Sequence, residues 1–383
     1  MEINLDNIAH NYASFKRLTK TRVMCVIKAD GYGHGSVALA QRLEKEGCDA
    51  FGVATLDEGL ELRRAGIHSF ILLFNHVSAH RLVEAINANL TMTIYSLDMA
   101  KEIFTAARIC NKIVNVHVKI DTGMTRIGFN PDRALLGLQY AHKLPNLKIE
   151  GVYTHFSSAD ETDFAYTDAQ IAKFQKVCEQ AEAAGIHIPI KHAAGSAAAM
   201  QHPKARLDMV RIGISLYGCY PSREVIVPKG FELKPAMQFK TQIYRINEVD
   251  EGVAVSYGRR FVTARKTKLA TIPIGYADGL SRVMMGKLTV LINGQVAHVV
   301  GRICMDQCIV DITDVEGEVK ILDEVVVFGG QNGAFLPVEA TADAMGTINY
   351  EILCMVARRI PRIYFEDGQI AEVKNYLIEE ELF

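Results

Sequence analysis

The 383-residue sequence lacks the features that mark several protein classes. No uninterrupted apolar run reaches about 18 residues, so we expect no membrane-spanning segment and no membrane partner. The formal net charge is only −2, from 42 Lys and Arg against 44 Asp and Glu, so no basic excess points to a nucleic-acid partner. The first residues, MEINLDNIAHNY, contain neither a basic stretch nor an apolar stretch, so we expect no signal peptide.

The cysteines follow no spacing typical of a metal site or a disulfide framework. All eight are scattered, and none forms a C-x-x-C pair. Cys304 and Cys308 lie four residues apart, but no histidine accompanies them, so we expect no metal site. We interpret the cysteines as free thiols of a cytoplasmic protein, because cytosolic thiols are kept reduced.

Length and composition are those of a globular protein with about two domains. Apolar residues make up 49% of the chain and charged residues 22%, which is enough apolar surface for a sizeable core. The pattern changes near Pro235, so we place one domain at residues 1–235 and a second at residues 236–383.

The first domain repeats a short β-branched run followed by an amphipathic helical stretch. This rhythm predicts an α/β fold, specifically an N-terminal (β/α)8 barrel of the TIM type, and the alternative is an open parallel sheet. Near-continuous apolar strands suit either fold, because both bury parallel strands on both faces. The predicted strands are Val23–Ile27, Ala50–Ala54, Phe70–Phe74, Thr91–Tyr95, Asn115–Ile120, Ile149–Thr154, Ile188–Lys191 and Asp208–Ile212.

The second domain alternates apolar and polar residues, which predicts a mostly-β C-terminal domain. Asn293-Gly294 lies between two such runs and predicts a tight hairpin. A further strand is expected over Lys320–Phe328, ended by Gly329-Gly330, and a single helix from Pro337 through Ala357.

Chemistry in a barrel lies at the carboxyl ends of the strands, so polar residues there are candidate site residues. Gly195-Ser196 and Gly213-Ile214 can offer backbone N–H groups and a hydroxyl to an anion. The candidates at strand ends are Lys28, Lys119, His155, His192, Ser196 and Arg211.

Lys28, in VIKADGYGHG, is the candidate amine with apolar flanks, which favour a desolvated, reactive lysine. A lysine, an anion-binding loop pair and cationic groups at one barrel end together suggest pyridoxal 5'-phosphate as cofactor. Each residue alone has a simpler interpretation. Lys28 can be a solvated charge, His155 a structural histidine and Arg211 an ion-pair partner.

The motif VIKADGYGHG closely resembles the cofactor-lysine motif of alanine racemases, which are isomerases that use pyridoxal phosphate and combine a barrel with a β domain. Further segments resemble motifs of that family in the same order along nearly the whole chain. Three departures are KADGYGHG for the more usual KANAYGHG, Gly195 where Asn is frequent, and Thr125 before Arg126. The other matching segments are KIDTGMTRIGF, YTHFSSAD, VRIGISLYG, SYGRRF, PIGYADG, GRICMDQ, GTINYEI and ARRIPRIY.

The resemblance implies racemisation of L- and D-alanine by two bases on opposite faces of the substrate. Lys28 would hold the cofactor and act as one base, and Tyr257 would be the other, supplied by the second subunit of a homodimer. Arg211 would face the pyridine nitrogen, with His155 linking Arg211 to Tyr257. The remaining residues implied to bind the cofactor are Tyr32, Ser196, Gly213, Ile214 and Tyr350.

Substrate contacts and biological role are also implied by the resemblance. Arg126 would lie near the substrate carboxylate, Met305 would offer its backbone N–H to that carboxylate, and Tyr276 would narrow the entrance. Lys119 matches a position that is often carbamylated in the family. The D-alanine would serve peptidoglycan of the cell wall. The alternatives are a serine-preferring racemase, a basic amino-acid decarboxylase of the same fold, and a non-catalytic carrier of pyridoxal phosphate.

Overall fold

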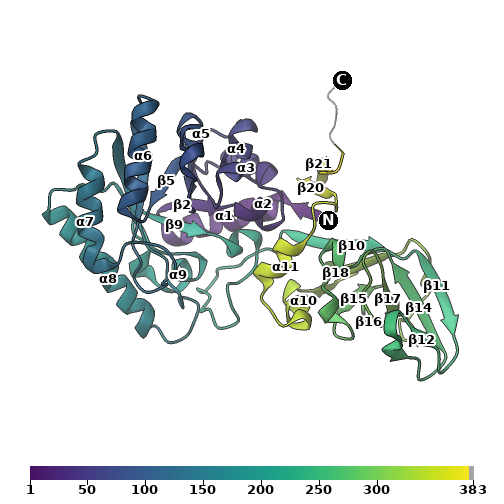
Figure 1. Cartoon of the computed structure of the whole chain (residues 1–383). Coiled ribbons are helices and arrows are strands. Elements are labelled where there is room, and N and C mark those ends of the chain that lie inside the picture. Colours follow the sequence, from purple (N-terminus) through teal and green to yellow (C-terminus); the bar gives the residue numbers. More distant parts are fainter. Residues whose placement is uncertain (379–383) are drawn as a thin grey trace. The chain divides into compact units, whose positions relative to one another are not determined.

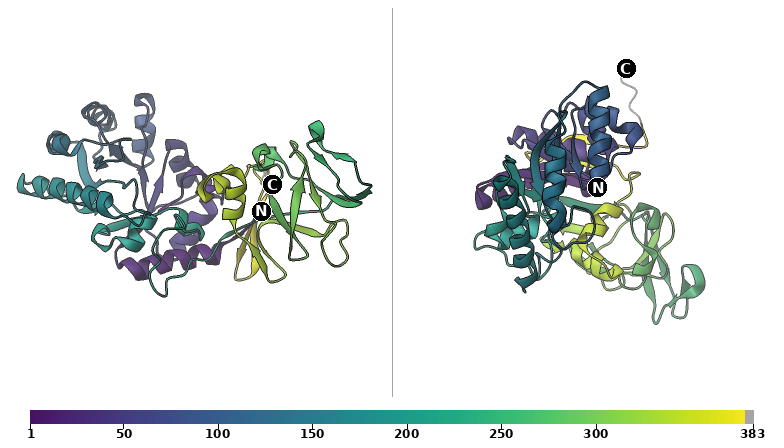
Figure 2. Two further views of the ribbon diagram at one scale, coloured as in Figure 1. Left: turned by 90° about the horizontal axis from the view of Figure 1, so that it is seen from below. Right: turned by 60° about the vertical axis from the view of Figure 1, so that its left-hand side comes forward.

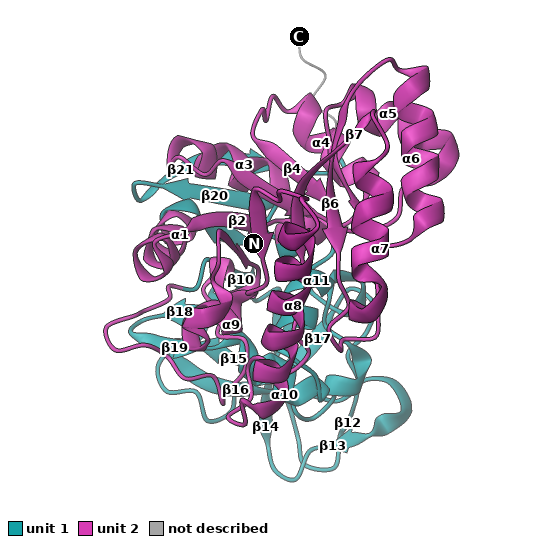
Figure 3. Ribbon diagram, turned by 90° about the vertical axis from the view of Figure 1, so that its left-hand side faces the viewer, with its two compact units in different colours: residues 1–6, 32–35, 235–383 teal, residues 7–31, 36–234 magenta. Residues whose placement is uncertain are grey.

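The computed structural model describes residues 1–378, and they form two compact units (Figure 3). The first, here the barrel unit, comprises Asn7–Gly31 and Ser36–Lys234. The second, here the β unit, comprises Met1–Asp6, Tyr32–Gly35 and the residues from Pro235 onward. The described helices include none with the length and apolar character that a membrane crossing requires.

Eight parallel strands of the barrel unit form one sheet in the order β8-β7-β6-β5-β4-β3-β2-β9. Backbone hydrogen bonds from Asp208 to Lys191 (3.1 Å) and from Arg211 to Ala194 (2.9 Å) connect the two ends of this order. The predicted barrel is therefore confirmed, and the open sheet is wrong. The strands are β2 (Arg22–Val26), β3 (Ala50–Val53), β4 (Phe70–Leu73), β5 (Thr91–Ile94), β6 (Val114–Lys119), β7 (Leu147–Tyr153), β8 (Ile190–His192) and β9 (Met209–Ile212).

Helices surround these strands on the outside (Figures 1 and 2). Side chains at the helix starts explain where several of them begin: Thr55, Ser96 and Asn130 each accept a backbone N–H of the first turn. The helices are α1 (Leu5–Thr19), α3 (Ser36–Lys45), α4 (Leu56–Arg64), α5 (Leu82–Asn87), α6 (Leu97–Ile109), α7 (Pro131–His142), α8 (Ala165–Ala183) and α9 (Ser196–Gln201).

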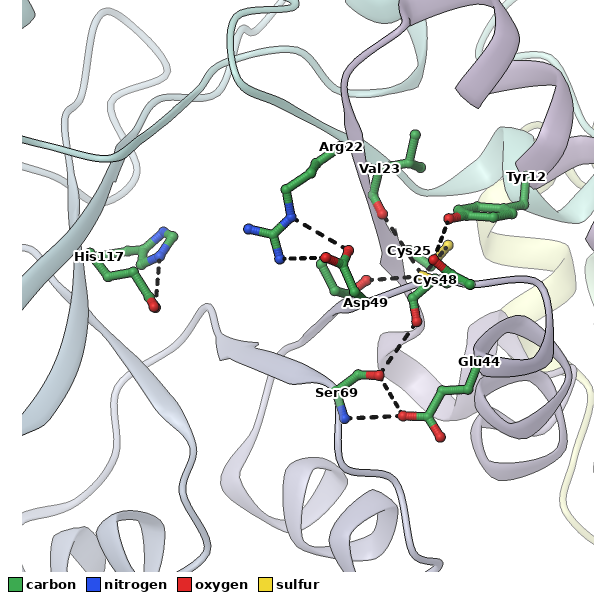
Figure 4. A network of polar contacts seen from close by, with 12 residues as sticks. Tyr12, Arg22, Val23, Cys25, Glu44, Cys48, Asp49, Ser69 and His117 are labelled. Atoms are coloured by element: carbon green, nitrogen blue, oxygen red, sulfur yellow. Dashed lines mark hydrogen bonds and ion pairs between the residues drawn. The ribbon is translucent and has the colours of Figure 1, made fainter.

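Polar side chains connect the amino ends of three neighbouring strands (Figure 4). Arg22, the first residue of β2, pairs with Asp49 just before β3 (Nη2 to Oδ2, 3.1 Å). Ser69, just before β4, donates its hydroxyl to the carbonyl of Cys48 shortly before β3 (3.4 Å). This end of a barrel generally serves stability, which leaves the opposite end for chemistry. Among the described residues, no cysteine takes part in a disulfide.

The β unit contains a mixed sheet in the order β11-β14-β17-β16-β15-β18-β10-β1-β20-β21, with β19 paired to β18, and a separate pair β12-β13. The predicted Asn293-Gly294 hairpin joins β15 to β16, and both turn residues have positive φ (54° and 76°). The strands are β1 (Glu2–Asn4), β10 (Met237–Gln242), β11 (Arg245–Val249), β12 (Ala254–Val255), β13 (Phe261–Val262), β14 (Thr267–Ile272), β15 (Thr289–Ile292), β16 (Gln295–Val300), β17 (Cys308–Asp311), β18 (Glu324–Gln331), β19 (Ala334–Leu336), β20 (Arg362–Glu366) and β21 (Gln369–Lys374).

Two local predictions in this unit are wrong. The single helix over residues 337–357 is two helices, α10 (Val338–Met345) and α11 (Asn349–Met355), because Gly346 takes φ 80° and ends the first. The strand expected over Lys320–Phe328 begins at Glu324 and continues through Gly329 and Gly330 as β18. Pairing with β19 holds those glycines in the sheet.

Candidate active site

Lys28 stands at the carboxyl end of β2 and opens an unusual turn, α2 (Lys28–Tyr32). Ala29, Asp30 and Gly31 all have left-handed backbone angles, with φ of 52°, 54° and 60°. The turn closes through a hydrogen bond from the Gly31 N–H to the Ile27 carbonyl (2.9 Å). Left-handed geometry costs a residue with a side chain roughly 1–2 kcal/mol, so other contacts must hold this turn.

Glu58 is one such contact, and the sequence analysis missed it. Its Oε1 accepts the backbone N–H of Ala29 (2.7 Å), and its Oε2 accepts those of Ala54 (2.7 Å) and Thr55 (3.0 Å). Glu58 is also the third residue of α4, where it completes a capping box with Thr55. That capping pattern was readable in the sequence, but the link to the lysine turn depends on the fold.

Arg211, on β9, lies in the barrel interior with only 4% of its surface exposed. Its guanidinium donates to the carbonyls of Thr154 (2.7 Å), His192 (3.1 Å) and Ala193 (2.9 Å). It also donates to Nδ1 of His192 (3.1 Å) and to Nδ1 of His155 (3.2 Å). Burial lowers the pKa of Arg211 to about 10, so the side chain remains a cation at neutral pH. Among the described residues, no carboxylate neutralises it by direct contact.

His155 marks the place where the cationic candidates gather. Burial first, and then the positive charges of Arg211, Lys119, Arg126 and Lys28, hold the pKa of His155 well below its usual range. The imidazole is therefore neutral, with its Nδ1 free of hydrogen to accept from Arg211. The structure thus brings together five of the residues predicted for the site at one end of the barrel.

Lys119, the last residue of β6, is 3% exposed. Its Nζ donates to the carbonyl of Ile120 (3.0 Å) and stands 5.3 Å from the ring centre of Tyr153. Burial, assisted by Arg211 and Arg126, lowers the pKa of Lys119 to about 7. A substantial fraction of this amine is therefore neutral and nucleophilic at physiological pH.

The predicted anion-binding loops meet after β8 and β9. Ser196 begins α9, and its Oγ accepts the backbone N–H of Gly213 (3.0 Å). The hydroxyl hydrogen of Ser196 remains available to a ligand, because Oγ acts there as the acceptor. Ile214 follows at the start of the 3₁₀ turn η3 (Ile214–Tyr217). A hydroxyl and loop backbone N–H groups suit a phosphate.

Tyr32 and Tyr350 belong to the β unit, where their ring centres lie 6.3 Å apart. Tyr32 is 8% exposed, and burial raises its pKa, so its phenol keeps its proton. Arg362 holds the Tyr32–Gly35 segment by donating from Nε to the Gly33 carbonyl (3.1 Å). A β-carbon on Gly33 would stand 2.3 Å from the Leu353 carbonyl oxygen, so only glycine fits there.

Tyr257 projects from a constrained turn of the β unit, with 67% of its surface exposed. Ser256 before it and Gly258 after it both have positive φ, 64° and 70°. The Ser256 hydroxyl donates to the Arg302 carbonyl (2.7 Å), which fixes the base of the turn. The Tyr257 side chain is therefore exposed, and the residue before it is held in place by a hydrogen bond.

Tyr276 and Met305 lie on neighbouring loops of the same unit. The Tyr276 N–H donates to the Cys304 carbonyl and the Ala277 N–H donates to the Met305 carbonyl, both at 3.0 Å. Tyr276 is 43% and Met305 53% exposed. These hydrogen bonds hold the two loops together and leave the side chains of Tyr276 and Met305 accessible to a ligand.

The residues of the barrel unit fit pyridoxal phosphate. A lysine suited to hold an aldehyde stands near the basic side chains Lys119, Arg126 and Arg211, which suit a ligand carrying phosphate and a substrate carrying carboxylate. Ser196 and the loop after β9 add neutral donors. A buried arginine whose direct partners include no carboxylate is a donor for a ring nitrogen.

Comparison with known proteins agrees with this chemistry. Residues 3–221 match the alanine racemase N-terminal domain family, and residues 236–364 match the alanine racemase C-terminal domain family. An alanine racemase of Clostridium novyi is 43% identical over 378 residues, covering 98% of this chain and 97% of the relative.

Solved structures give the same result. An alanine racemase of Clostridium difficile superposes with a TM-score of 0.94 at 43% identity, covering 98% of each chain. One from Bacillus anthracis with bound L-Ala-P gives a TM-score of 0.92 at 33% identity, covering 98% of this chain and 97% of that one. The chain belongs to the alanine racemase family of pyridoxal-phosphate-dependent isomerases, and its activity is the interconversion of L- and D-alanine.

Proposed function

We propose that the reaction uses two bases, with Lys28 on one face of the substrate and Tyr257 of a second copy on the other. Racemisation removes the α-proton from one face and returns a proton to the opposite face, so two bases can act without turning the substrate. Two observations support the proposal. Lys28 opens a turn at the carboxyl end of β2 that Glu58 holds in place, and the Tyr257 phenol is exposed, which suits a base that serves a second copy.

The cofactor supplies one thing when bound, which is an electron-withdrawing ring that stabilises negative charge at the α-carbon. The chain's part is to hold and orient it. Lys28 would anchor its aldehyde, Arg211 would donate to its pyridine nitrogen, and His155 accepts a hydrogen bond from Arg211. The residues that would bind its phosphate are Tyr32, Ser196, Tyr350 and the backbone of Gly213 and Ile214.

Arg211 limits how strongly the ring can withdraw electrons. A guanidinium whose pKa is about 10 would donate a hydrogen bond to the ring nitrogen without readily giving up the proton. The ring therefore withdraws electrons less strongly than it would beside a carboxylic acid. We infer that this favours return of the proton to the α-carbon over side reactions.

Lys119 is proposed to be carbamylated. Carbon dioxide reacts with a neutral amine, and burial lowers the pKa of Lys119 to about 7, which makes that form available. The reaction releases a proton and converts the neutral amine into a carbamate anion, which has Arg126 and Arg211 as cationic neighbours. The modified side chain would orient Arg126 toward the substrate carboxylate.

The substrate carboxylate is proposed to meet Arg126 and the backbone N–H of Met305, with Tyr276 and Tyr350 narrowing the entrance. A phenol at the entrance admits a methyl side chain and crowds a larger one, which favours alanine over serine. A tyrosine base and an arginine at the ring nitrogen argue against the decarboxylase alternative.

The proposal extends to the oligomeric state of the protein, its cellular location, its domain boundary and the use of its product. Tyr257 is 67% exposed in the single chain, which suits a residue that serves a second copy in a homodimer. Eight free thiols suit a cytoplasmic enzyme. We also propose that the domains divide at 235/236 and that the D-alanine formed is used in peptidoglycan.

Proton NMR of L-alanine in D2O tests the reaction. With the holoenzyme, the α-proton signal should disappear, the methyl doublet should collapse, and D-alanine should appear in a chiral assay. Tyr257→Phe should remove exchange that starts from one enantiomer far more than exchange from the other. Equal residual exchange from both enantiomers in Tyr257→Phe would contradict the two-base assignment.

A further inference from the structure

A β-bulge between β6 and β7 turns an acidic side chain into the barrel. Val116 pairs with Ile149 and His117 pairs with Gly151, so Glu150 is an extra residue opposite no partner. A bulge redirects the side chain that it carries. Gly151 leaves the space: a β-carbon there would stand 2.4 Å from Cε1 of His117.

Four side chains then form one line of contacts, here called the relay. Nη1 of Arg211 lies 3.1 Å from Nδ1 of His192. Nε2 of His192 lies 2.9 Å from Nδ1 of His117. Nε2 of His117 lies 3.6 Å from Oε2 of Glu150.

Arg211, the first residue of the relay, decides which ring nitrogen of each histidine carries the hydrogen. A guanidinium only donates, so Nδ1 of His192 accepts and the ring hydrogen of His192 is on Nε2. That hydrogen points to His117, whose Nδ1 accepts in turn. The ring hydrogen of His117 is therefore on Nε2, facing the Glu150 carboxylate.

The contact between His117 and Glu150 gives each of these two buried groups its partner. Nε2 of His117 and Oε2 of Glu150 are both buried, and neither has a hydrogen-bond partner among the described residues at ordinary distance. A buried unpaired donor and a buried unpaired carboxylate oxygen are both costly. Asn115 donates to the other oxygen of Glu150 (3.2 Å) and leaves Oε2 directed at His117.

We propose that His117 and Glu150 are positioning residues for Arg211, holding His192 in the one tautomer that can accept from the guanidinium. The relay gives the buried arginine an anionic counterpart through two neutral rings without placing a carboxylate beside it. Arg211 then keeps a free hydrogen-bond direction for the ring nitrogen that it is proposed to face.

Burial supports the neutral state of both rings. It lowers the pKa of His117, although Glu150 partly opposes this, and it holds the pKa of His192 well below its usual range. Both histidines are fully buried. Hydrogen bonds in such a chain polarise one another, so a change at Glu150 is felt at Arg211.

Neutron diffraction from crystals of the deuterated holoenzyme tests the relay directly. We expect deuterium on Nε2 of both His117 and His192 and none on either Nδ1. Deuterium on Nδ1 of either ring would overturn the relay, because the line of donors would then be broken.

Kinetics of Glu150→Gln test its consequence, with Glu179→Gln on the exposed face of α8 as the matched control. Glu150→Gln should lower kcat about tenfold and change KM for alanine less than about twofold, as for other groups that orient a site residue. It should also shift the cofactor absorbance maximum, which a loss of stability alone would not do. A kcat less than about threefold below the control overturns the positioning role.

Gly151→Ala cuts the relay at a different place. Its added methyl displaces the His117 ring and leaves Glu150 in the chain. It should lower kcat as Glu150→Gln does and shift the absorbance maximum in the same direction, and opposite shifts would overturn the proposal. The inference rests on the proposed role of Arg211, which Arg211→Lys tests separately. The neutron result depends neither on that role nor on the kinetics of any variant.

Discussion

Lys119 allows a quantitative test of how strongly the barrel interior disfavours a charge. Its side chain is 3% exposed, and burial lowers its pKa from the ordinary 10.5 to about 7. One step in pKa corresponds to roughly 1.4 kcal/mol. Holding the protonated amine in this buried site beside Arg211 and Arg126 therefore costs about 5 kcal/mol of folding free energy below pH 7.

The sign of the pH dependence follows from proton binding. Between the folded pKa near 7 and the unfolded pKa near 10.5, the unfolded chain holds one more proton at this site than the folded chain. The free energy of unfolding should therefore rise with pH, by about 1.4 kcal/mol for each step in pH. Lys119→Met has no such group and lacks this contribution.

Urea unfolding of the wild-type and Lys119→Met apoproteins, in CO2-free buffer from pH 6.5 to 9.5, measures the difference. Titrating groups remote from Lys119 cancel between the two proteins. Lys119→Met should be more stable by several kcal/mol at pH 6.5, and the advantage should shrink steadily as the pH rises. Bicarbonate at pH 8 should stabilise only the wild type. Parallel stability curves for the two proteins would refute the reasoning.

Three further predictions concern the site. Arg211→Glu should raise pyruvate formation per racemisation turnover about tenfold, because an acid beside the ring nitrogen strengthens electron withdrawal; an unchanged partition measured by coupled assay would count against the role of Arg211. Tyr350→Ala should raise the serine-to-alanine ratio of kcat/KM about tenfold, since one removed contact at a pocket wall has that order of effect; an unchanged ratio would remove Tyr350 from the specificity argument. Glu58→Gln and Thr55→Ala should each destabilise the protein, by about 1–3 kcal/mol in thermal unfolding. Only Glu58→Gln should change the pH titration of the Lys28-bound cofactor absorbance, because only Glu58 holds the N–H of Ala29; equal titrations would show that Glu58 merely caps α4.

The sequence was informative where a local pattern alone decides the structure. The apolar run from Val23 is buried on both faces as β2, so its position could be read from composition. Asn293 and Gly294 tolerate positive φ, so they predicted a hairpin that the structure contains. Lys28, His155 and Arg211 could be assigned together because parallel strands end at the same side of a barrel.

Elsewhere tertiary contacts overrode the local signal. Two consecutive glycines, Gly329 and Gly330, suggest the end of a strand, but pairing with β19 keeps them in β18. Helical residues on both sides of Gly346 predict one helix, and the left-handed glycine divides it. Glu58 reads as an ordinary capping residue, and only the packing of β2 beside β3 brings Ala29 to its carboxylate.

The sequence by itself determined the alternation of strands and helices in the first domain and the residues at its strand ends, because periodicity and turn chemistry act over a few residues. Closure of these strands into a barrel depends on contacts between β8 and β9 and the residues beside them, such as the hydrogen bond from Asp208 to Lys191. Only the tertiary structure decided that Glu150 points into the barrel and that His117, His192 and Arg211 share one line of protons. A bulge is a mismatch between two strands, and a tautomer depends on partners that lie 75 and 19 residues away from His192 in the chain. Neither is a property of any single segment.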